Sequence, residues 1–304
     1  MEKLIDLHIH TNISDGELSP KEVIDEAKKN GLYAIAIADH DTTEAYTDDL
    51  FTYAKEQGIK LINAVEISTK TNKAGIHVLG YNFDLKNQEF KDRLKSLRNA
   101  RHDYLYNVAQ KLKECNYLVN VEELDKIDAV TKAHIALDVI SNKANEKELI
   151  SEFGHIPNKG EFIETIMNEG CKAYVKKDAI TPIEAAELIK SASGIVVLAH
   201  PVAYHYEDNL SEEDLQNLVI EMKADGIESN YIYIDRNNTK HNDIDKWTKF
   251  AKKLNLPSTI GSDFHKNDGI HPVIGLLNED INLNDDDIDN ILSFIEKKTN
   301  SETN

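Results

Sequence analysis

The chain has 304 residues, of which 40% are hydrophobic and 29% charged, a balance typical of a globular protein with one large domain or one domain carrying an insertion. Lysine and arginine number 35 against 54 aspartates and glutamates, so the formal net charge is −19. A protein this acidic is not expected to bind long nucleic acid or anionic membranes tightly. A small phosphorylated ligand stays compatible, because metal ions can supply local positive charge.

The cysteine content and the N-terminal residues indicate the compartment. Cys115 and Cys171 are the only cysteines and form no spaced motif, so we expect no disulfide framework. The opening residues "MEKLIDLHIHT" hold acidic residues and histidines where a signal peptide would have an apolar core. No apolar run approaches the length of a membrane-spanning helix. We therefore expect a cytoplasmic protein.

Short β-branched runs recur along the chain and predict seven strands. Segments with helical periodicity lie between most of them, and three of these begin at a Ser or Thr and end at a Gly, as helices do. This alternation predicts an α/β fold with parallel strands joined by right-handed crossovers. The predicted strands lie at 4–10, 33–41, 60–68, 75–81, 194–201, 226–231 and 257–265.

The alternation stops between about residue 85 and residue 175. This stretch is mostly helical, as in "FKDRLKSLRNARHDYLYNVAQKLKE", and shows little strand signal. We expect an inserted helical subdomain over 85–175, between a first part of the α/β domain at 1–84 and a second part at 176–304. The segment "NDDDIDNILSFIEKK" predicts a final amphipathic helix, followed by a frayed tail.

Residue types that bind metal ions gather at the ends of the predicted strands. The carboxyl ends of parallel strands meet at one edge of the sheet, and the two-residue period puts His8 and His10 on one face, and Asp263 and His265 on one face. A lone histidine at a strand end is usually structural, but five strand ends with histidine favour a metal site. The residues are His8, His10, Asp39, His40, Asp41, Glu66, His77, His200, Asp263 and His265.

Imidazole and carboxylate ligands suit manganese, iron or zinc, whereas a thiolate site would need cysteines that are absent from this pattern. The number of ligands exceeds the needs of one ion. We expect two or three divalent metal ions, manganese first and iron or zinc as alternatives, with Glu66 or Asp263 available as a bridge. Such centres lower the pKa of a bound water and stabilise both oxygens of a phosphoryl transfer.

In this order the motifs resemble those of the polymerase and histidinol phosphatase (PHP) superfamily over the whole chain. They read "DLHIHTNISDG", "IADHDT", "NAVEIS", "IHVLGY", "LAHP" and "GSDFH". The resemblance implies a distorted (β/α)7 barrel with a trinuclear metal centre at the carboxyl ends of the strands.

The resemblance also implies how the ligands divide among the metals. His8, His10, Glu66 and Asp263 would hold one ion; Glu66, His77 and His200 a second; Asp15, His40 and His265 the third. Among these, Glu66, Asp263 and His265 would be catalytic. Asp39 and Asp41 flank a ligand and are expected to orient His40. Capping of the helix that follows them is an equally open role.

The size and position of the insertion resemble the branch that hydrolyses 3′,5′-nucleoside bisphosphates and short 5′-phosphorylated RNA. The resemblance implies a phosphomonoesterase that uses a metal-activated hydroxide on a small phosphorylated nucleotide, with a short RNA oligonucleotide as a second candidate substrate. In that branch the insertion binds phosphate, and the candidates here are Arg98, Arg101, Lys132 and His134. The sequence departs from the branch at Lys132-Ala133, where Arg-Pro is usual, and at Ala64, where glycine is usual. Both departures concern the substrate more than the metal centre.

Three other functions stay open. A histidinol phosphate phosphatase shares the superfamily and differs in its substrate. An amidohydrolase also begins with a His-x-His strand, but it usually needs a metal-bridging lysine, and none lies at a predicted strand end. A metal-bound scaffold module without turnover is the third, and only an activity measurement separates it from an enzyme.

Overall fold

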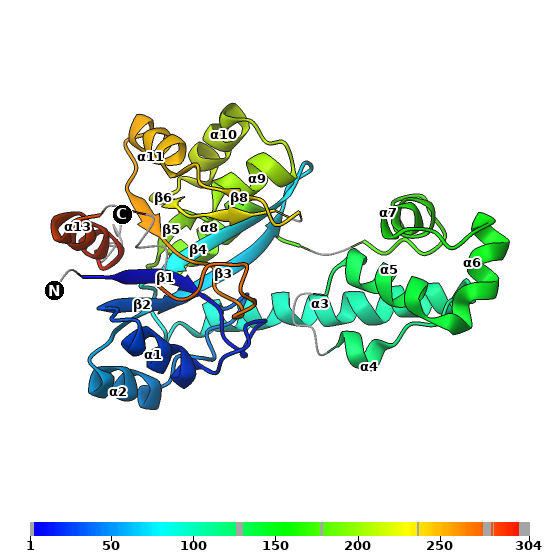
Figure 1. Cartoon of the computed structure of the whole chain (residues 1–304), viewed down its shortest axis with the longest axis horizontal. Helices are drawn as coiled ribbons and strands as arrows, with labels where there is room; N and C mark the ends of the chain where they lie inside the picture. The colour runs from blue at the N-terminus through cyan, green and yellow to red at the C-terminus, as the bar shows by residue number, and fades with distance from the viewer. Residues whose placement is uncertain are drawn as a thin grey trace. The chain divides into compact units, whose positions relative to one another are not determined.

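The computed structural model describes residues 3–125, 130–176, 179–235, 237–275, 281 and 283–297, except for the side chains of residues 101 and 102. The chain divides into two compact units (Figure 1). One consists of Met1–Leu94 together with Ala179–Asn304, and the other is Lys95–Asp178. We call them the barrel unit and the helical unit. No helix among the described residues is both long enough and apolar enough to cross a membrane.

The barrel unit is built on a seven-stranded sheet that nearly closes on itself, which confirms the predicted α/β class and the number of strands in the sheet. Its order is β1-β2-β3-β4-β5-β6-β9. Beyond the last strand Ile9 pairs with Phe264, and the His10 amide donates to the Phe264 carbonyl at 2.9 Å, so the two edges meet. The strands are β1 Ile5–Ile9, β2 Ala34–Ile37, β3 Lys60–Lys70, β4 Gly75–Tyr81, β5 Ile195–Leu198, β6 Gly226–Asn230 and β9 Ser258–Ile260.

The expectation of an all-parallel sheet is wrong at β4, which runs antiparallel to both β3 and β5. Only residues 71–74 join β3 to β4, and a connection this short makes a hairpin, whereas a parallel crossover needs a dozen or more residues. The reversal matters for the site. It brings His77, near the start of β4, to the same end of the barrel as the carboxyl ends of the parallel strands.

The predicted last strand, 257–265, is too long. Strand β9 ends at Ile260, and Asp263 adopts a left-handed backbone with φ 54°. Asp263 and His265 therefore lie beyond the regular strand, and strand alternation does not explain why they converge. A second, two-stranded sheet of β7 (Tyr233–Ile234) and β8 (Lys240–His241) was not predicted, because its strands are too short to show a period.

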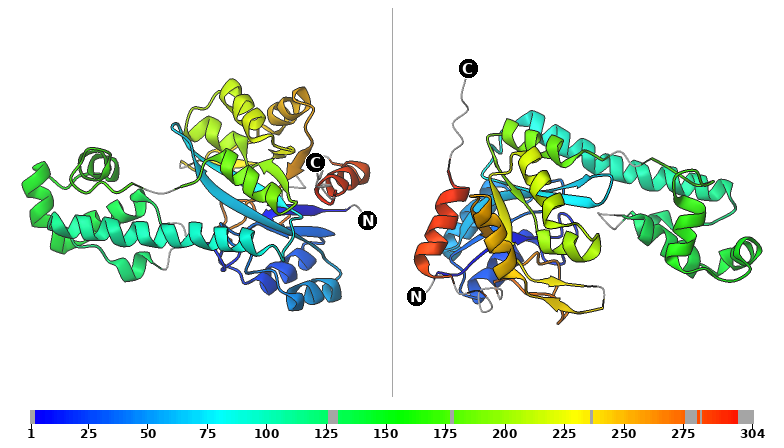
Figure 2. Two further views of the ribbon diagram at one scale, coloured as in Figure 1. Left: turned by 180° about the vertical axis from the view of Figure 1, so that it is seen from behind. Right: turned by 90° about the horizontal axis from the view of Figure 1, so that it is seen from above.

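Most helices of the barrel unit lie around the outside of the barrel, as the opposite views of Figure 1 and Figure 2 (left) show. The three that sequence signals placed are confirmed at their starts: each begins one residue after the predicted Ser or Thr, whose side chain caps it and forms a capping box with N3. The predicted glycine ends are wrong for two of them, because α8 already ends at Ser191 and α10 at Met222, and Gly226 begins β6. The helices of the barrel unit are α1 Pro20–Lys29, α2 Asp48–Gln57, α8 Pro182–Ser191, α9 Pro201–Glu207, α10 Glu212–Met222, α11 Ile244–Lys253 and α13 Asp285–Ile295.

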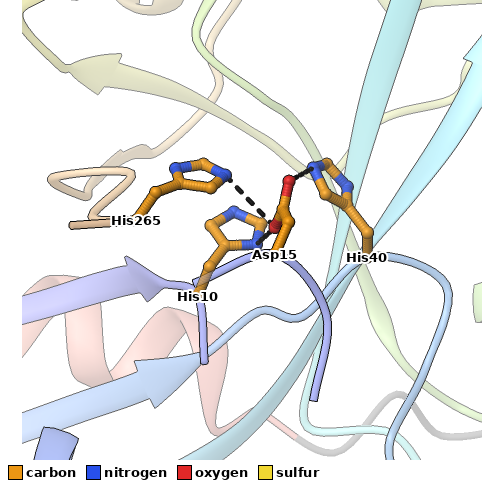
Figure 3. Close-up of side chains that lie close together, drawn as sticks. All are labelled: His10, Asp15, His40 and His265. Atoms are coloured by element: carbon orange, nitrogen blue, oxygen red, sulfur yellow. Dashed lines mark ion pairs between the residues drawn. The ribbon is translucent and has the colours of Figure 1, made fainter. Parts of the chain in front are cut away.

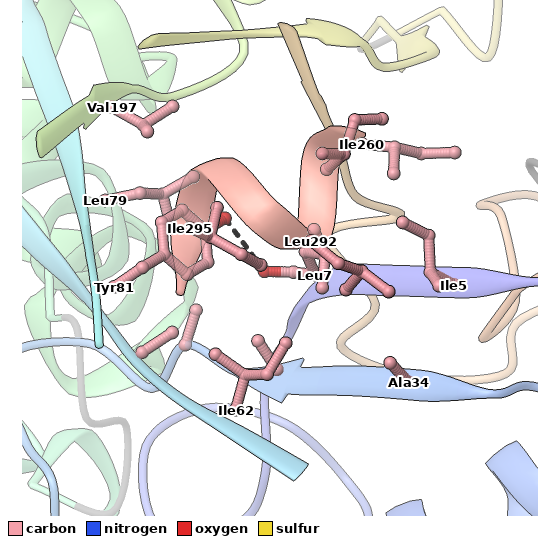
Figure 4. Close-up of a cluster of buried hydrophobic side chains, with 14 of the residues drawn as sticks. Ile5, Leu7, Ala34, Ile62, Leu79, Tyr81, Val197, Ile260, Leu292 and Ile295 are labelled. Carbon is pink, nitrogen blue, oxygen red and sulfur yellow. Dashed lines mark hydrogen bonds between the residues drawn. The ribbon is translucent and has the colours of Figure 1, made fainter. Parts of the chain in front are cut away.

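The predicted final helix is confirmed as α13, and its apolar face completes the core of the barrel (Figure 4). Leu292 and Ile295 pack in one cluster with Ile5 and Ala34, the first residues of their strands. The helix thus closes the barrel at the amino ends of the parallel strands. Polar ligands are left to gather at the opposite, carboxyl ends. The predicted tail lies outside the described residues.

The helical unit has its own core. Its helices pack around fully buried side chains such as Tyr117 and Phe162, and the buried Asn145 amide bonds the backbone of Leu118 and Val139. The long helix α3 begins in the barrel unit and continues into this one. The helices are α3 Gln88–Glu114, α4 Val121–Leu124, α5 Lys132–Ser141, α6 Glu146–Phe153 and α7 Lys159–Phe162, with a 3-10 turn at Lys143–Asn145 and a π turn at Ile163–Met167.

Gly261 allows the barrel to close around the site, which gives a stability prediction. A Cβ at this position would lie 2.2 Å from the His8 Cβ and 2.4 Å from a Glu228 carboxylate oxygen. We expect Gly261→Ala to lower the free energy of unfolding by about 1–3 kcal/mol, because neither neighbour is free to move. The measurement is urea unfolding in a metal chelator. Gly75→Ala is the control, since its Cβ would meet nothing closer than 3.9 Å. Equal unfolding midpoints for the two variants would contradict this account.

Candidate metal centre

The carboxyl end of the barrel brings together all nine residues predicted as ligands. Among the described residues, three groups have ligand atoms within 4.8 Å of one another and could each hold an ion. The groups are His10, Asp15, His40 and His265; His8, His10, Glu66 and Asp263; and His40, Glu66 and His77.

Glu66 lies at the middle of the centre and is 1% exposed. Its Oε1 lies 3.0 Å from both His77 Nδ1 and His200 Nε2. Its Oε2 lies 3.2 Å from His40 Nδ1 and 3.3 Å from the Nε2 atoms of His8 and His10. The two carboxylate oxygens thus face different sets of imidazoles, which is the arrangement that a bridging carboxylate needs.

Asp263 completes a second side of the centre. Its Oδ1 lies 3.1 Å from His10 Nε2 and 3.4 Å from His8 Nε2, while the two Nε2 atoms lie 3.1 Å apart. Two imidazole nitrogens can approach this closely only if at least one offers a lone pair. The left-handed backbone of Asp263 costs about 1–3 kcal/mol for a residue with a side chain, a strain typical of functional sites.

The third side gathers around Asp15, as Figure 3 shows. Asp15 Oδ1 lies 3.3 Å from His265 Nε2 and 3.5 Å from His10 Nδ1, and Oδ2 lies 3.7 Å from His40 Nε2. The grouping differs in detail from the one the family resemblance implied, because His10 and His40 each belong to two groups. Such sharing is possible because both nitrogens of each ring face a carboxylate.

Glu228 is a residue of the site that the sequence analysis missed. It is fully buried in β6. Its carboxylate accepts one hydrogen bond from His8 Nδ1 and another from the His200 backbone amide, both at 3.0 Å. It therefore holds a proton on His8 Nδ1, so that Nε2 is the nitrogen left for a metal ion. A carboxylate in the otherwise buried strand "GIESN" was the signal, because a buried charge must have partners.

Asp6 is a second missed residue. It is buried in β1, and its carboxylate accepts hydrogen bonds from the backbone amides of Ser262 and Gly275, both at 2.9 Å. Burial raises the pKa of Asp6 to about 6, and hydrogen bonds from Ser262 and Gly275 oppose that rise. Asp6 thereby fastens the segment after β9, which carries Asp263 and His265, to the first strand.

The two aspartates beside His40 have definite partners. Asp39 accepts hydrogen bonds from the Thr11 amide and hydroxyl, each at 2.7 Å, and from the Ser14 hydroxyl at 2.6 Å. It therefore holds the loop that presents Asp15. Asp41 Oδ1 accepts a hydrogen bond from the Ser68 backbone amide at 3.0 Å. The alternative of helix capping is not what forms, since Thr47 caps α2.

Divalent metal ions fit this donor set. Several buried side-chain atoms of the centre have no hydrogen-bond partner, although each lies among other ligand atoms. Oxygen and imidazole nitrogen atoms whose lone pairs converge in a buried space need a cation between them. These atoms are His10 Nδ1, Glu66 Oε2 and Asp263 Oδ1. The buried clusters indicate more than one metal site.

The electrostatics of the centre favour ionised carboxylates. Burial alone would raise the pKa of Glu66, but His77, His8 and His40 hold it well below its usual range. Burial likewise would raise the pKa of Asp263, but His8 and His265 hold it well below its usual range. Burial alone would lower the pKa of His10, but nearby Asp263, Glu66 and Asp15 raise it to about 10. Protons and metal ions therefore compete for the same atoms.

The predicted phosphate-binding residues belong to the helical unit. Lys132 Nζ donates to Asn168 Oδ1 at 3.0 Å, and the exposed His134 forms a capping box with Thr131 at the start of α5. Arg98 is half-buried on α3, and the side chain of Arg101 lies outside the described residues. A phosphate-binding role for these four residues stays a prediction.

An α/β barrel with carboxylate and imidazole clusters at its carboxyl end defines a class of metal-dependent hydrolases. Within that class, the model of the PHP domain matches residues 6–238, so the chain belongs to the PHP family. The resemblance predicted from the motifs is confirmed.

Characterised relatives and a solved structure agree with this assignment. The chain is 33% identical over 271 residues to the 5′-3′ exoribonuclease of Haemophilus influenzae, covering 87% of this chain and 91% of that protein. It is 25% identical over 265 residues to the 3′,5′-nucleoside bisphosphate phosphatase of Chromobacterium violaceum, covering 86% and 87%. A proposed metal-dependent phosphoesterase from Bifidobacterium adolescentis has the same fold, with a TM-score of 0.65, 24% identity and 96% of each chain covered. This protein is thus a metal-dependent hydrolase of the phosphoesterase type.

Removal of the Glu228 charge should weaken metal binding. We expect Glu228→Gln to reduce manganese affinity about 10–100-fold, because the amide loses the negative charge and replaces one accepting oxygen with an N–H donor that faces the donors His8 Nδ1–H and the His200 backbone amide. The measurement is metal content and manganese titration by calorimetry. The matched control is Glu296→Gln on the surface, where the carboxylate pairs with the half-exposed Lys60. Unchanged affinity in Glu228→Gln would show that the Glu228 carboxylate does not support metal binding.

Metal binding should release protons. In the metal-free centre His10 is protonated below a pKa of about 10, so at pH 8 a metal ion at this imidazole must displace a proton. Affinity should therefore rise as pH rises from 6 to 8 and fall in acid. The measurement is calorimetry of manganese binding at pH 8 in two buffers of different ionisation enthalpy. Identical heats in both buffers would contradict the prediction, and His10→Gln should release fewer protons.

Proposed function

We propose that this protein hydrolyses the phosphoryl group on the 3′ oxygen of a small 5′-phosphorylated nucleotide, with a 3′,5′-nucleoside bisphosphate as the substrate. The observation that carries the proposal is the shared Glu66, whose two oxygens face separate sets of imidazoles at 3.0–3.3 Å. Metal ions held by a shared carboxylate would suit phosphoryl transfer, because negative charge develops on both the attacking and the leaving oxygen.

The two named relatives support the substrate class. One is called a 3′,5′-nucleoside bisphosphate phosphatase and the other a 5′-3′ exoribonuclease. Both substrates can be described as one 5′-terminal nucleotide whose 3′ oxygen is esterified to phosphorus. In the first case the ester is a phosphomonoester, and in the second it is the first linkage of an RNA chain. The greater identity to the exoribonuclease favours short 5′-phosphorylated RNA as a second substrate.

We assign the ligands as the sequence resemblance implied. His8, His10, Asp15, His40, Glu66, His77, His200, Asp263 and His265 would hold two or three divalent ions, with manganese first and iron or zinc as alternatives. Bound there, the ions lower the pKa of a water and neutralise charge on the phosphoryl oxygens.

The protein's own residues keep this centre in one arrangement. Glu66, Asp263 and His265 surround the reacting group in our assignment. The Tyr231 hydroxyl donates to Asp263 Oδ2 at 3.1 Å and so orients the carboxylate. Asp39 fixes the loop of Asp15 through Thr11 and Ser14. In the reaction, the oxygen of water bonds to phosphorus, the bond from phosphorus to the 3′ oxygen breaks, and that oxygen takes a proton as the product leaves.

Activity of the manganese-reconstituted protein tests the proposal. We expect release of phosphate from adenosine 3′,5′-bisphosphate to exceed release from histidinol phosphate by at least about tenfold in kcat/KM, with mononucleotide release from a 5′-phosphorylated RNA dinucleotide as the second activity. Preference for histidinol phosphate would overturn the substrate and leave the metal assignment in place. No turnover of any of the three would overturn the proposal.

Loss of a ligand should remove both metal and activity. We expect Glu66→Gln and Asp263→Asn to lower kcat/KM by more than about a hundredfold and to reduce metal content, since even groups behind the ligands change metal affinity 10–100-fold. The matched controls are Glu296→Gln and Asp49→Asn, which change surface carboxylates paired with lysines. Activity that survived both ligand substitutions would exclude this centre as the reaction site.

A further inference from the structure

A cavity of about 280 Å³ opens beside the candidate metal centre, entirely within the barrel unit. One wall is formed by residues 231–234, which lead from β6 into β7, and the other by residues of the loop 262–272. We call it the 231–272 cleft. Asp263 and His265 belong to both the cleft and the centre, so a molecule bound in the cleft would reach the ligands directly.

The walls of the cleft are mainly apolar and aromatic. Ile232, Ile234 and Pro272 line it together with the rings of Tyr231 and Tyr233. This composition suits a flat, largely apolar ring. A bare phosphate or a hydrated sugar phosphate would leave most of this surface unused.

The rim of the cleft is polar. The Lys266 side chain is 61% exposed, and its Nζ lies 3.8 Å from Asp268, which also pairs with His271 Nδ1 at 2.7 Å. Asp268 offsets much of the positive charge of these two groups. The rim can therefore attract an anionic ligand, but it is a weaker phosphate site than unpaired cations would be.

The first wall is anchored by contacts with neighbouring elements. The Tyr233 hydroxyl donates to Glu207 Oε1 at 2.6 Å, and the ring of His241 on β8 stacks on Tyr206 with centroids 3.9 Å apart. His241 Nε2 also contacts Asp235 Oδ2 at 3.1 Å, within the same hairpin. A preformed wall reduces the entropy lost when a ligand binds.

We propose that the 231–272 cleft binds the nucleoside of the substrate, with the base between the apolar walls and the ribose toward Asp263 and His265. The inference rests on the proposed function and names the part of the site that selects the substrate. The volume lies near the lower end of the roughly 300–1,000 Å³ of small-molecule sites, so the cleft accommodates one nucleoside and not a stack of several. The base, and not only the phosphates, then contributes to recognition.

The first measurement compares substrates on the unmodified, manganese-loaded protein. Adenosine 3′,5′-bisphosphate is compared with its base-free counterpart, 1-O-methyl-ribose 3,5-bisphosphate. We expect the base-free compound to have at least a tenfold lower kcat/KM, with most of the difference in KM. Equal kcat/KM for the two compounds would overturn the cleft proposal while leaving the proposed function intact. Failure to hydrolyse either compound would overturn the proposed function itself.

The second measurement uses a variant in which a larger side chain fills the cleft. We expect Ile234→Trp to raise KM for adenosine 3′,5′-bisphosphate at least tenfold and to change kcat/KM for the base-free compound less than twofold. Calorimetry should show the same loss in affinity for adenosine 5′-monophosphate, independently of turnover. Ile220→Trp is the matched control, because Ile220 is 59% exposed on α10 and does not line the cleft. Equal effects of Ile234→Trp on both compounds would contradict the proposal.

A third variant separates the nucleoside from a phosphate as the occupant, and it does not depend on the folding of Ile234→Trp. Lys266→Gln changes only an exposed rim residue. If the cleft binds the nucleoside, the variant should raise KM for both bisphosphates by the same small factor and keep the preference for the adenosine compound. A loss of more than tenfold with both, together with no preference for the base, would identify the cleft as a phosphate site and overturn the proposal.

Discussion

The structure depends on the compensation of one buried charge, the carboxylate of Glu66. A carboxylate that is 1% exposed is stable as an anion only if partners replace the lost water, and here imidazoles lie around both of its oxygens. Those imidazoles come from strands far apart in the sequence. The closure of the barrel and the charge balance of the centre therefore depend on each other, because each strand must end where its side chain can face Glu66.

A second set of buried carboxylates keeps that arrangement. Glu228 binds His8 and the backbone of His200, Asp6 binds the segment after β9, and Asp39 binds the loop of Asp15. Each of these groups joins segments of different strands and makes hydrogen bonds that orient a ligand. The centre is thus preorganised by the protein, and metal ions would replace protons in a site whose shape already exists.

The cleft beside the centre gives the same barrel a means of selecting its substrate. The metal ligands treat every phosphoryl group alike, because they recognise charge and oxygen. Tyr231 links the two parts, since its ring lines the cleft while its hydroxyl bonds Asp263. In the proposed function, the chemistry comes from the carboxyl ends of the strands and the choice of substrate from the irregular segments that follow β6 and β9.

The sequence by itself determined the ligand types, the α/β class, the number of strands in the main sheet and the starts of three capped helices. These follow from local patterns: histidines two residues apart, β-branched runs, and a Ser or Thr at the start of a segment with helical periodicity. It did not give the reversal of β4, the early end of β9 or the short hairpin of β7 and β8, because these depend on pairing with distant strands. Glu228 lies outside the quoted motifs, and Asp6 begins the motif "DLHIHTNISDG" without being a predicted ligand, so only the tertiary structure shows what they bind. Local sequence patterns thus identify which residue types serve as ligands. Which atoms of Glu66, His10 and His40 face one another was decided by the tertiary structure, because that depends on the closure of the whole barrel.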